Sequence, residues 1–508
     1  MNHVEFLAKE RRVYAQEDGQ LMSDRSDIES WNKPHANLAK WLDNILSRYE
    51  GTPVDVITWD IGMEPTTARI YTRGETAPFD TAKVPILKTW QDKGLDALDE
   101  CIKEAKKRGI ESFWCYRVSE VDLPPVTEEY NKNVALWTSP LRHNGLKEQH
   151  PDWLVQCWWP QGHWNLANAE LRQRQVNVIS ELLRNYDLDG LEIDFTRHTP
   201  FLPPGREEEL HSCVTAFLSD IRKEIQKIER EKKRPILLAV KIAENPAGCR
   251  LDGMAVEEWM HDGLVDILFL GGRTAAIDFT GFRALPGAEH VKLVPMLDGH
   301  HTDAGAHRPD AELLRGIFSN WLVRGADSIG VFNWTYGNYW YLGGLFDANM
   351  PSLNVLRELN NPETMMKRPK KYRIDSRGEY PWAGNYTYRN DDKPLPATVA
   401  HGAGVILPVE IWTEEPGITK LELLIENLRE GDLMEAQLNG MALRRLEYVS
   451  AKNDPHRGFQ PEEAEKTFPG QSFAVPAGAV KVGANLITLQ FRANVHPVLF
   501  TVMMAELS

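Results

Sequence analysis

The sequence predicts a (β/α)8-barrel followed by a smaller β-sandwich domain. Three observations support this fold: eight apolar runs alternate with helical patterns before residue 340, a polar segment follows near residue 360, and strand-like runs complete the chain. A chain of 508 residues is too long for one hydrophobic core, so at least two domains are expected. We assign the barrel to residues 1–360, a linker to 361–375 and the sandwich to 376–508.

The eight apolar runs are typical of parallel strands that are buried on both faces. Most are nearly continuous in hydrophobic residues, as expected where helices cover a parallel sheet. Strand–helix alternation repeated eight times favours a closed barrel, with an open doubly wound sheet as the alternative. The runs are Arg12–Glu17, Val54–Asp60, Ser112–Val118, Gly190–Phe195, Ile236–Ile242, Val265–Leu270, Val291–Leu297 and Ser328–Trp334.

Helical patterns separate these strands. Residues 91–108 end in basic residues before Gly109, which is typical of a helix C-terminus. Residues 206–232 and 310–324 place apolar side chains three and four positions apart on one face. The long stretch 119–165 carries Trp and His, and connections of this length usually serve function, so we expect it to line a cleft.

The part of the chain after the linker reads as a β-sandwich. Turn signals such as Asn439-Gly440 separate its apolar runs, and no amphipathic helix of ordinary length interrupts them. The expected strands are Val405–Val409, Lys420–Glu426, Leu433–Leu438, Gln471–Val475, Asn485–Phe491 and Val498–Met503.

Composition narrows the classes of partner. A formal net charge of −15 without a long basic run argues against nucleic acid, because phosphate binding needs a basic surface. No run of about 18 apolar residues is present, so no membrane span is expected. The first residues lack an apolar stretch of signal-peptide length, which predicts a cytoplasmic protein, although a trimmed secreted chain would look the same. Five scattered cysteines without C-x-x-C indicate neither a disulfide framework nor a zinc knuckle.

The fourth strand carries the clearest candidate for chemistry. Side chains alternate along a strand, so Glu192 and Asp194 share one face while Leu191, Ile193 and Phe195 share the other. Because the apolar face must meet the covering helices, both carboxylates should point into the barrel, with Asp194 nearer the mouth. A purely structural ion-pair network with Lys241 or Arg197 is the alternative to a functional role.

Other polar side chains follow the C-terminal ends of the strands, where barrel enzymes place their reacting groups. Glu244 and Asp298 are the candidate partners of Asp194 in catalysis, ahead of Asp60 at the end of the second strand. A helix or loop cap is the alternative for Asp60, and a solvated loop position is the alternative for Glu244. We expect the remaining candidates to bind substrate or tune the acids: Arg117, Lys241, Arg273, His301, Asn333 and Trp334.

A metal site is not predicted. His300 and His301 are adjacent, so they point opposite ways in an extended segment, and at most one of them could join Asp298. We therefore expect no cofactor. The rival hypothesis is a metal-dependent lyase or isomerase in which Glu120, Asp194 and Glu244 hold Mg2+ through oxygen ligands.

Inward carboxylates together with many aromatic residues suit a carbohydrate substrate. Glycosidic cleavage needs a carboxylic acid to protonate the leaving oxygen and a carboxylate as nucleophile or base. Aromatic rings offer flat apolar faces to sugar rings, and the chain has 16 Trp and 14 Tyr. Trp159 and His163 lie in the segment 153–164, where we expect at least one exposed ring, although core packing would account for about half of the aromatics.

The motif around Asp194 resembles that of a known group. The string YDLDGLEIDF (186–195) is similar to the fourth-strand motif of glycosyl hydrolase-like family 10 proteins and their bacterial relatives. WMHDGLVDILF (259–269) and GADSIGVFN (325–333) look like the sixth- and eighth-strand regions of the same group, and the outline covers most of residues 10–350. The resemblance implies a barrel glycosidase whose acids must be located independently.

A more distant resemblance is to the family 18 chitinase motif, Asp-Gly-x-Asp-x-Asp-x-Glu. The chain fits it at Asp189, Gly190 and Asp194, but Glu192 replaces an Asp and Thr196 stands where the catalytic Glu belongs. This departure argues against the substrate-assisted chitinase mechanism.

The sequence therefore predicts a glycoside hydrolase acting on an oligo- or polysaccharide, with Asp194 as nucleophile or base. The anomeric outcome, the sugar, the role of the sandwich and the oligomeric state stay open. Besides the metal-dependent enzyme, a carbohydrate-binding protein with a decayed active site is an alternative.

Overall fold

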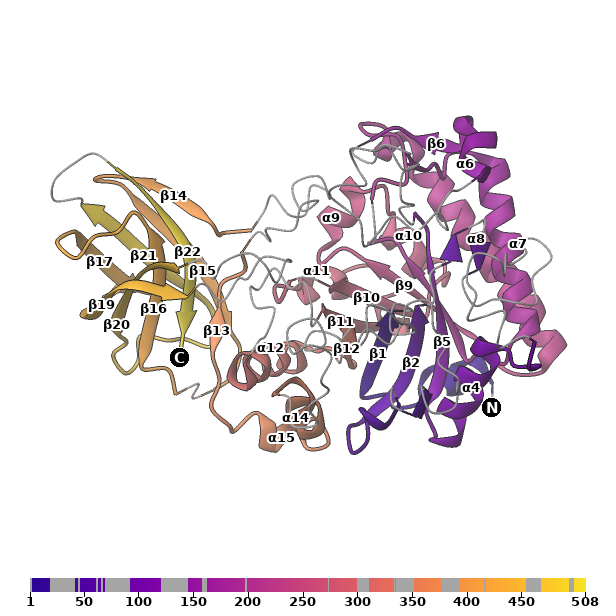
Figure 1. The fold of residues 1–508 in the computed structure, drawn as a ribbon, viewed down its shortest axis with the longest axis horizontal. Coiled ribbons are helices and arrows are strands. Elements are labelled where there is room, and N and C mark those ends of the chain that lie inside the picture. Colours follow the sequence, from indigo (N-terminus) through magenta and orange to yellow (C-terminus); the bar gives the residue numbers. More distant parts are fainter. Residues whose placement is uncertain are drawn as a thin grey trace.

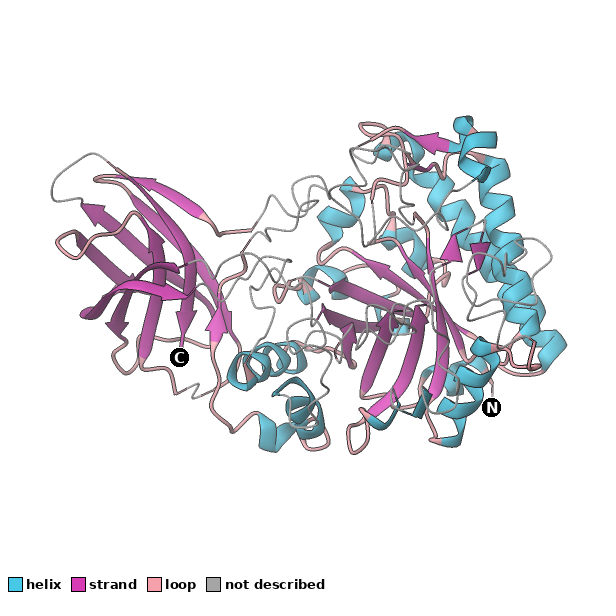
Figure 2. Ribbon diagram, viewed as in Figure 1, coloured by secondary structure: helices cyan, strands magenta, loops and turns pink. Residues whose placement is uncertain are grey.

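The protein is described by a computed structural model that contains a closed barrel and a pair of antiparallel sheets (Figures 1 and 2). The predicted fold class, a (β/α)8-barrel followed by an all-β domain, is confirmed. The described residues are 2–18, 42–43, 46–60, 63–64, 67–68, 92–119, 145–157, 162–196, 199–272, 274–298, 310–332, 334, 351–376, 393–414, 417–453, 467–492 and 498–508.

Eight parallel strands close the barrel in the order of the chain. Each strand pairs with the next, and the last pairs with the first through Val13 opposite Ile329. All eight predicted strands are present with small shifts at their ends, so the open-sheet alternative is wrong. The strands are β1 (Val13–Asp18), β2 (Val54–Asp60), β5 (Glu111–Arg117), β8 (Gly190–Asp194), β9 (Leu237–Ile242), β10 (Ile267–Gly272), β11 (Lys292–Asp298) and β12 (Ile329–Phe332).

Helices follow the strands and cover the outside of the barrel (Figure 2). The three predicted helices are present, and the amphipathic helix between β5 and β8 was not predicted. In chain order they are α4 (Ala97–Lys107), α6 (Gly145–Gln149), α7 (Ala169–Asn185), α8 (Glu207–Lys232), α9 (Pro246–Leu251), α10 (Val256–His261), α11 (Phe279–Arg283), α12 (Ala311–Val323), α14 (Pro351–Glu358) and α15 (Pro362–Met365).

Strand alternation sorts the side chains into two cores. Leu191 and Ile193 of β8 point outward and join the large core between strands and helices. The opposite faces of the strands build a smaller core inside the barrel, so the barrel is filled by side chains and not hollow. Its members are Tyr14, Val56, Phe113, Leu237, Ala239, Ile267, Phe269, Val294, Met296 and Phe332.

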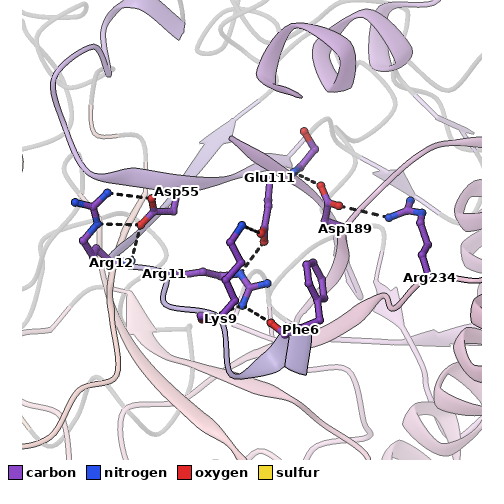
Figure 3. Close-up of polar contacts among 9 residues, drawn as sticks. Phe6, Lys9, Arg11, Arg12, Asp55, Glu111, Asp189 and Arg234 are labelled. Carbon is purple, nitrogen blue, oxygen red and sulfur yellow. Dashed lines mark hydrogen bonds and ion pairs between the residues drawn. The ribbon is translucent and has the colours of Figure 1, made fainter. Parts of the chain in front are cut away.

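The N-terminal end of the barrel is closed by α1 (His3–Leu7) and an ionic layer (Figure 3). Phe6 and Leu7 pack against the inner core from below. Arg11 Nε donates to Glu111 Oε2 at 2.6 Å, and Lys9 pairs with the same carboxylate. The Arg11 guanidinium also lies 4.6 Å from the Phe6 ring centroid. These contacts make this end a structural base.

The C-terminal domain consists of two antiparallel sheets that face each other across one apolar core. One sheet contains β13 (Tyr372–Arg373), β14 (Ala397–Ala400), β16 (Lys420–Glu426), β19 (Arg444–Asn453), β20 (Thr467–Ala474) and β22 (Leu499–Leu507). The other contains β15 (Gly404–Ile411), β17 (Leu433–Leu438), β18 (Met441–Ala442) and β21 (Gly483–Arg492). Two short hairpins, β3 (Met63–Glu64) with β4 (Thr67–Ala68) and β6 (Leu154–Val155) with β7 (His163–Trp164), lie outside these sheets.

Specific polar contacts join the barrel to the sandwich beside α12. Asn320 donates to the carbonyl of Glu410 at 2.8 Å and accepts from the backbone N–H of Trp412 at 2.9 Å. Arg324 pairs with the Glu410 carboxylate at 2.5 Å and lies over the Trp412 ring. Tyr372–Arg373, within the segment that we assign as the linker, already pairs with β22 of the sandwich. The linker boundaries at residues 361 and 375 remain a proposal.

None of the helices in the described ranges is long and apolar enough to cross a bilayer.

His3 connects α1 to the base of the barrel through two carboxylates. Its Nδ1 lies 2.8 Å from Glu229 and its Nε2 lies 2.9 Å from Asp266. The hydrogen bonds to Asp266 and Glu229 raise the pKa of His3 from 6.5 to about 9, against the effect of burial. A raised folded-state pKa means that the contact stabilises the fold fully below pH 6.5 and is lost as the pH rises through about 9.

We therefore expect His3→Asn to lower the free energy of unfolding by about 1–2 kcal/mol near pH 6, a value discounted for the partial exposure of the ring. The difference from the wild type should shrink between pH 6.5 and 9. Urea unfolding of both proteins from pH 6 to pH 10 measures it, and a difference independent of pH would contradict the assignment.

Candidate active site at the mouth of the barrel

A layer of buried polar side chains lies above the apolar core inside the barrel. Tyr14, Phe113, Ala239 and Met296 belong to the inner core. Because side chains alternate along a strand, the residue two positions after each of them also points inward, and it is polar in every case. These residues come from β1, β2, β5, β8, β9 and β11, at the C-terminal ends where barrel enzymes hold their reacting groups. They are Gln16, Thr58, Cys115, Arg117, Glu192, Asp194, Lys241 and Asp298, all buried.

Asp194 ends β8 and points into the barrel, as the sequence predicted. Its register partners are Arg117 on β5 and Lys241 on β9, so a cationic residue flanks it on each side. Asp194 Oδ1 also accepts hydrogen bonds from the backbone N–H and the hydroxyl of Thr196, both at 2.8 Å. Position 196 of the chain thus holds a donor to Asp194.

These contacts keep Asp194 ionised although it is buried. Burial, the largest influence, raises the pKa of Asp194, but the charges of Lys241 and Arg117 and the two hydrogen bonds from Thr196 together outweigh it. The resulting pKa of Asp194 lies below its ordinary value. A carboxylate in this state can act as a nucleophile or base, and it is unsuited to donate a proton.

Lys241 forms a floor under the mouth by crossing the barrel. Strand β9 is the fourth neighbour of β1 in either direction around the ring, so the two strands face each other. Lys241 Nζ donates to Gln16 Oε1 of β1 at 3.0 Å and lies 4.6 Å from the Phe332 ring centroid. Gln16 Nε2 in turn contacts Cys115 Sγ at 3.4 Å. These contacts link β9, β1 and β5 within the polar layer and join the layer to Phe332 of β12.

Glycines at the end of β10 shape the wall beside this floor. Gly271 has φ +71° and Gly272 has φ +149°, which are conformations that residues with a side chain rarely adopt. A Cβ atom at Gly272 would lie 3.5 Å from Cε of Lys241. The end of β10 therefore lies directly beside the Lys241 side chain.

Glu192 lies one inward position below Asp194, opposite Cys115 in the register. One ligand-type atom from each of Cys115, Glu192 and Asp194 lies within 4.8 Å of the others. This spacing would fit a metal ion. However, the charges of Lys241 and Arg117 already act on Asp194, and they disfavour a further cation there. The cluster fits a charge-balanced layer better than a metal centre.

Asp298 and Glu244, the two proposed partners of Asp194, differ in setting. Asp298 is the last residue of β11 and follows Val294 and Met296 of the inner core on the same face, with 1% of its surface exposed. Glu244 lies two residues beyond β9 and forms an ion pair with Lys393 at 3.1 Å. Lys393 belongs to the chain that leads into β14 of the sandwich.

The remaining sequence candidates fall into two groups. His163, on the hairpin β6–β7, is buried and contacts the carbonyl of Pro200 at 3.0 Å, and Trp334 packs against Phe318 of α12 in the outer core. Both have structural contacts in these positions. The side chain of Asp60 and the residues Trp159, Arg273, His301 and Asn333 lie outside the described residues, as do Glu120 and Arg197.

The two tryptophans that the structure describes in the 153–164 segment are core residues. Trp153 and Trp164 are buried together with Leu171 in a small satellite core, and His150 stacks on Trp153 with ring centroids 3.9 Å apart. Lys147 lies over the Trp164 ring. The expectation of an exposed ring therefore falls on Trp158 or Trp159, outside the described residues.

Five residues of the site were not predicted from the sequence. Gln16, Thr58 and Cys115 could have been found, because each lies two positions from an inward neighbour, Tyr14, Val56 and Arg117 respectively. Thr196 was noted only as a departure from a motif. Lys393 carries no local signal, since it meets Glu244 across 149 positions of sequence.

The fold and this polar layer define the class of the protein: a (β/α)8-barrel with a C-terminal β-sandwich and a carboxylate-bearing mouth. No known family model matches the chain, and no curated protein matches it significantly. The resemblance to glycosyl hydrolase-like family 10 is therefore not established by these comparisons.

Among solved structures, the chain is similar to α-L-fucosidase isoenzyme 2 from Paenibacillus thiaminolyticus, with a TM-score of 0.43 and 16% identity over 70% of this chain and 49% of that one. The chain thus matches about half the length of that fucosidase. The PgaB (BpsB) glycoside hydrolase domain from Bordetella bronchiseptica gives a TM-score of 0.43 and 14% identity, covering 69% of this chain and 99% of that one. The α-amylase AmyB from Thermotoga neapolitana gives a TM-score of 0.37 and 12% identity, covering 94% of this chain and 98% of that one. At these values no residue role transfers to this chain.

We expect Lys241→Met to destabilise the protein by about 3–5 kcal/mol, because Asp194 loses one of its two buried cationic neighbours. Asp194→Asn should also destabilise it, and the double variant should lose less than the sum of the single losses. Urea unfolding of the three variants measures this coupling, and strictly additive losses would show that the two residues do not interact.

The same variants test the charge of Asp194. A carboxyl group whose pKa is lowered by folding stabilises the folded state at any pH above its unfolded-state pKa of 3.8. This stabilisation is lost as the pH falls through the folded-state pKa. The difference between the wild type and Asp194→Asn should therefore persist from pH 7 to about pH 4 and diminish below it. A difference that disappears near pH 6 would contradict the assignment.

Proposed function

We propose that the protein is a glycoside hydrolase that acts on an oligo- or polysaccharide, with Asp194 as its nucleophile or base. The observation that carries this proposal is a buried, ionised carboxylate held at the mouth of a barrel. Glycosidic cleavage passes through a transition state with oxocarbenium character, and a fixed negative charge beside the anomeric carbon stabilises it.

The surroundings of Asp194 suit this role. Two cationic residues and two hydrogen bonds keep it in the charged form, so it need not lose a proton before it reacts. Thr196 fixes Oδ1 through both of its donors, and we assign Oδ2 to the anomeric carbon. Lys241 and Gln16 form the floor on which the sugar would rest.

We assign Asp298 as the proton donor. It lies on β11, three strands from β8 around the ring, so a sugar at the mouth would lie between the two carboxyl groups. Glu244 is the weaker candidate because an ion pair with Lys393 engages its Oε1. A separation of about 5–5.5 Å between the reacting carboxyl groups would accompany retention, and about 6.5–9.5 Å would accompany inversion.

The rival metal-dependent enzyme is less consistent with the described contacts. It needs Glu244 as a ligand, whereas Lys393 occupies that carboxylate, and it needs a cation beside Asp194, where Lys241 and Arg117 already act. Activity that disappears with EDTA and returns with Mg2+ would favour this rival. Activity indifferent to EDTA would favour the hydrolase.

The proposal is tested by screening the protein against soluble polysaccharides and aryl glycosides, with release of reducing ends or of the phenol as the readout. Asp194→Asn should abolish hydrolysis of every substrate that the wild type cleaves, whatever its leaving group. Asp298→Asn should slow cleavage of natural glycosides by about 10²–10⁴-fold. It should have little effect on 2,4-dinitrophenyl glycosides, whose leaving group needs no proton.

A matched control is Asp189→Asn, which removes a carboxylate five positions away in the same segment. Asp189 lies at the base of the barrel, where it accepts from the backbone N–H of Ser112 and pairs with Arg234 (Figure 3). The Asp189→Asn variant should keep its hydrolytic activity, and only its stability should change. Full activity of Asp194→Asn, or no hydrolysis by the wild type on any substrate, would refute the proposal.

A further inference from the structure

The sandwich domain sends one charged side chain to the barrel mouth. Lys393 lies four residues before β14, which pairs with β22 in the sandwich. Its ammonium group is 3.1 Å from Glu244 Oε1 of the barrel. The two side chains are only 7% and 9% exposed, so this is a buried ion pair between the domains.

Glu244 is held firmly from the side of the barrel. It follows β9 by two residues, and its backbone carbonyl accepts a hydrogen bond from the N–H of Asp278 at 2.9 Å. Its Cβ lies 3.5 Å from the position that a Cβ on Gly271 would take, at the end of β10. Glu244 therefore occupies a defined place between the ends of β9 and β10.

The segment that carries Lys393 is anchored as well. Upstream of it, Asp375 accepts hydrogen bonds from the hydroxyl of Thr274 and from the backbone N–H groups of Ala275 and Ala276, directly after β10. Downstream, Asn320 and Arg324 of α12 bind β15 at Glu410. The chain is thus held to the barrel before and after Lys393, at Asp375 and at Glu410.

Stability alone is a poor reason for such a pair. Removing two charges from water costs several kcal/mol per ion, and apolar replacements of buried pairs are often neutral or stabilising. The pair lies at the mouth, one strand from Asp194, where an oriented carboxylate can bind a sugar. A carboxylate beside an ammonium group accepts hydrogen bonds from vicinal sugar hydroxyls and does not supply the proton for the leaving group.

We propose that Lys393 is a positioning residue, contributed by the sandwich domain, that holds Glu244 as a substrate-binding carboxylate. Lys393 engages Oε1, and Oε2 accepts from a hydroxyl group of the sugar. The binding site of the barrel is therefore complete only with the sandwich in place. This inference rests on the proposed glycosidase function and adds to it a role for the second domain.

The test uses kcat and KM of the full chain on two glycosides of the sugar that the wild type cleaves. One carries a 2,4-dinitrophenyl leaving group and the other a 4-methylphenyl leaving group, which needs a proton donor. The variants are Lys393→Met, Lys393→Arg and Glu244→Gln. Lys371→Met is the matched control, because it removes a linker lysine that pairs with Asp310 of the barrel at 2.7 Å.

We expect Lys393→Met and Glu244→Gln to raise KM by about 10- to 100-fold, which corresponds to a lost hydrogen bond to a charged group. The factor should be the same for both leaving groups, with a smaller change in kcat. Lys393→Arg should restore most of the affinity, and Lys371→Met should leave KM unchanged. If Lys393→Met does not fold, the KM values of Lys393→Arg and Glu244→Gln test the inference.

Four outcomes would overturn the inference. A loss in Glu244→Gln that appears with the 4-methylphenyl glycoside and vanishes with the dinitrophenyl glycoside would make Glu244 the acid. A lowered Tm of Lys393→Met with an unchanged KM would reduce the pair to a structural contact. An inactive wild type would refute the proposed function and this inference together, whereas an active wild type with a normal Lys393→Met would refute this inference alone.

Discussion

The electrostatic attraction between Lys241 and Asp194 is the interaction on which the polar interior of the barrel depends. A carboxylate cannot stay charged in an apolar core unless positive charge lies close to it. Lys241 supplies that charge and also reaches the far wall at Gln16. Because one side chain serves both purposes, the charge state of the site and the packing of the barrel interior are linked.

The two ends of the barrel use charge differently. At the base, Glu111 meets Arg11 and Lys9, and each carboxylate in Figure 3 has a cationic partner or a backbone donor that fixes the first strands and α1. At the mouth, carboxylates and cations alternate across neighbouring strands, as with Arg117, Asp194 and Lys241. The base gains rigidity from its pairs, and the mouth gains a defined field in which a reacting group can keep its charge.

The fold could be predicted from the sequence because its signals are local. Runs such as LEIDF and ILFLGG show on their own that a strand is buried, and their repetition along the chain implies a barrel. Strand β19 was missed because most of its side chains face solvent, so the apolar pattern that marks a strand is absent there. The amphipathic helix α7 was not predicted, because the aromatic residues of the preceding stretch 119–165 gave the stronger sequence signal.

The candidate site was predictable only where alternation along a strand sufficed. The inward direction of Glu192 and Asp194 follows from the apolar residues that alternate with them along the strand, and this direction is observed. Trp334 was expected to contact substrate because it lies at the end of the predicted eighth strand, but β12 ends at Phe332, and beyond that residue the ring of Trp334 packs against Phe318 in the outer core. The contact of Glu244 with Lys393 depends on how two domains meet, and no spacing in the sequence encodes that.

The close approach at Gly316 has a consequence for how this architecture can change in evolution. A Cβ atom there would lie 2.0 Å from the carbonyl oxygen of Lys371, so α12 and the segment entering the sandwich are in backbone contact. Any larger residue at position 316 would collide with the backbone at Lys371 and displace the segment that leads into the sandwich. The two domains therefore behave as one inherited unit: a foreign sandwich could replace this one only if it reproduced the same backbone path past α12.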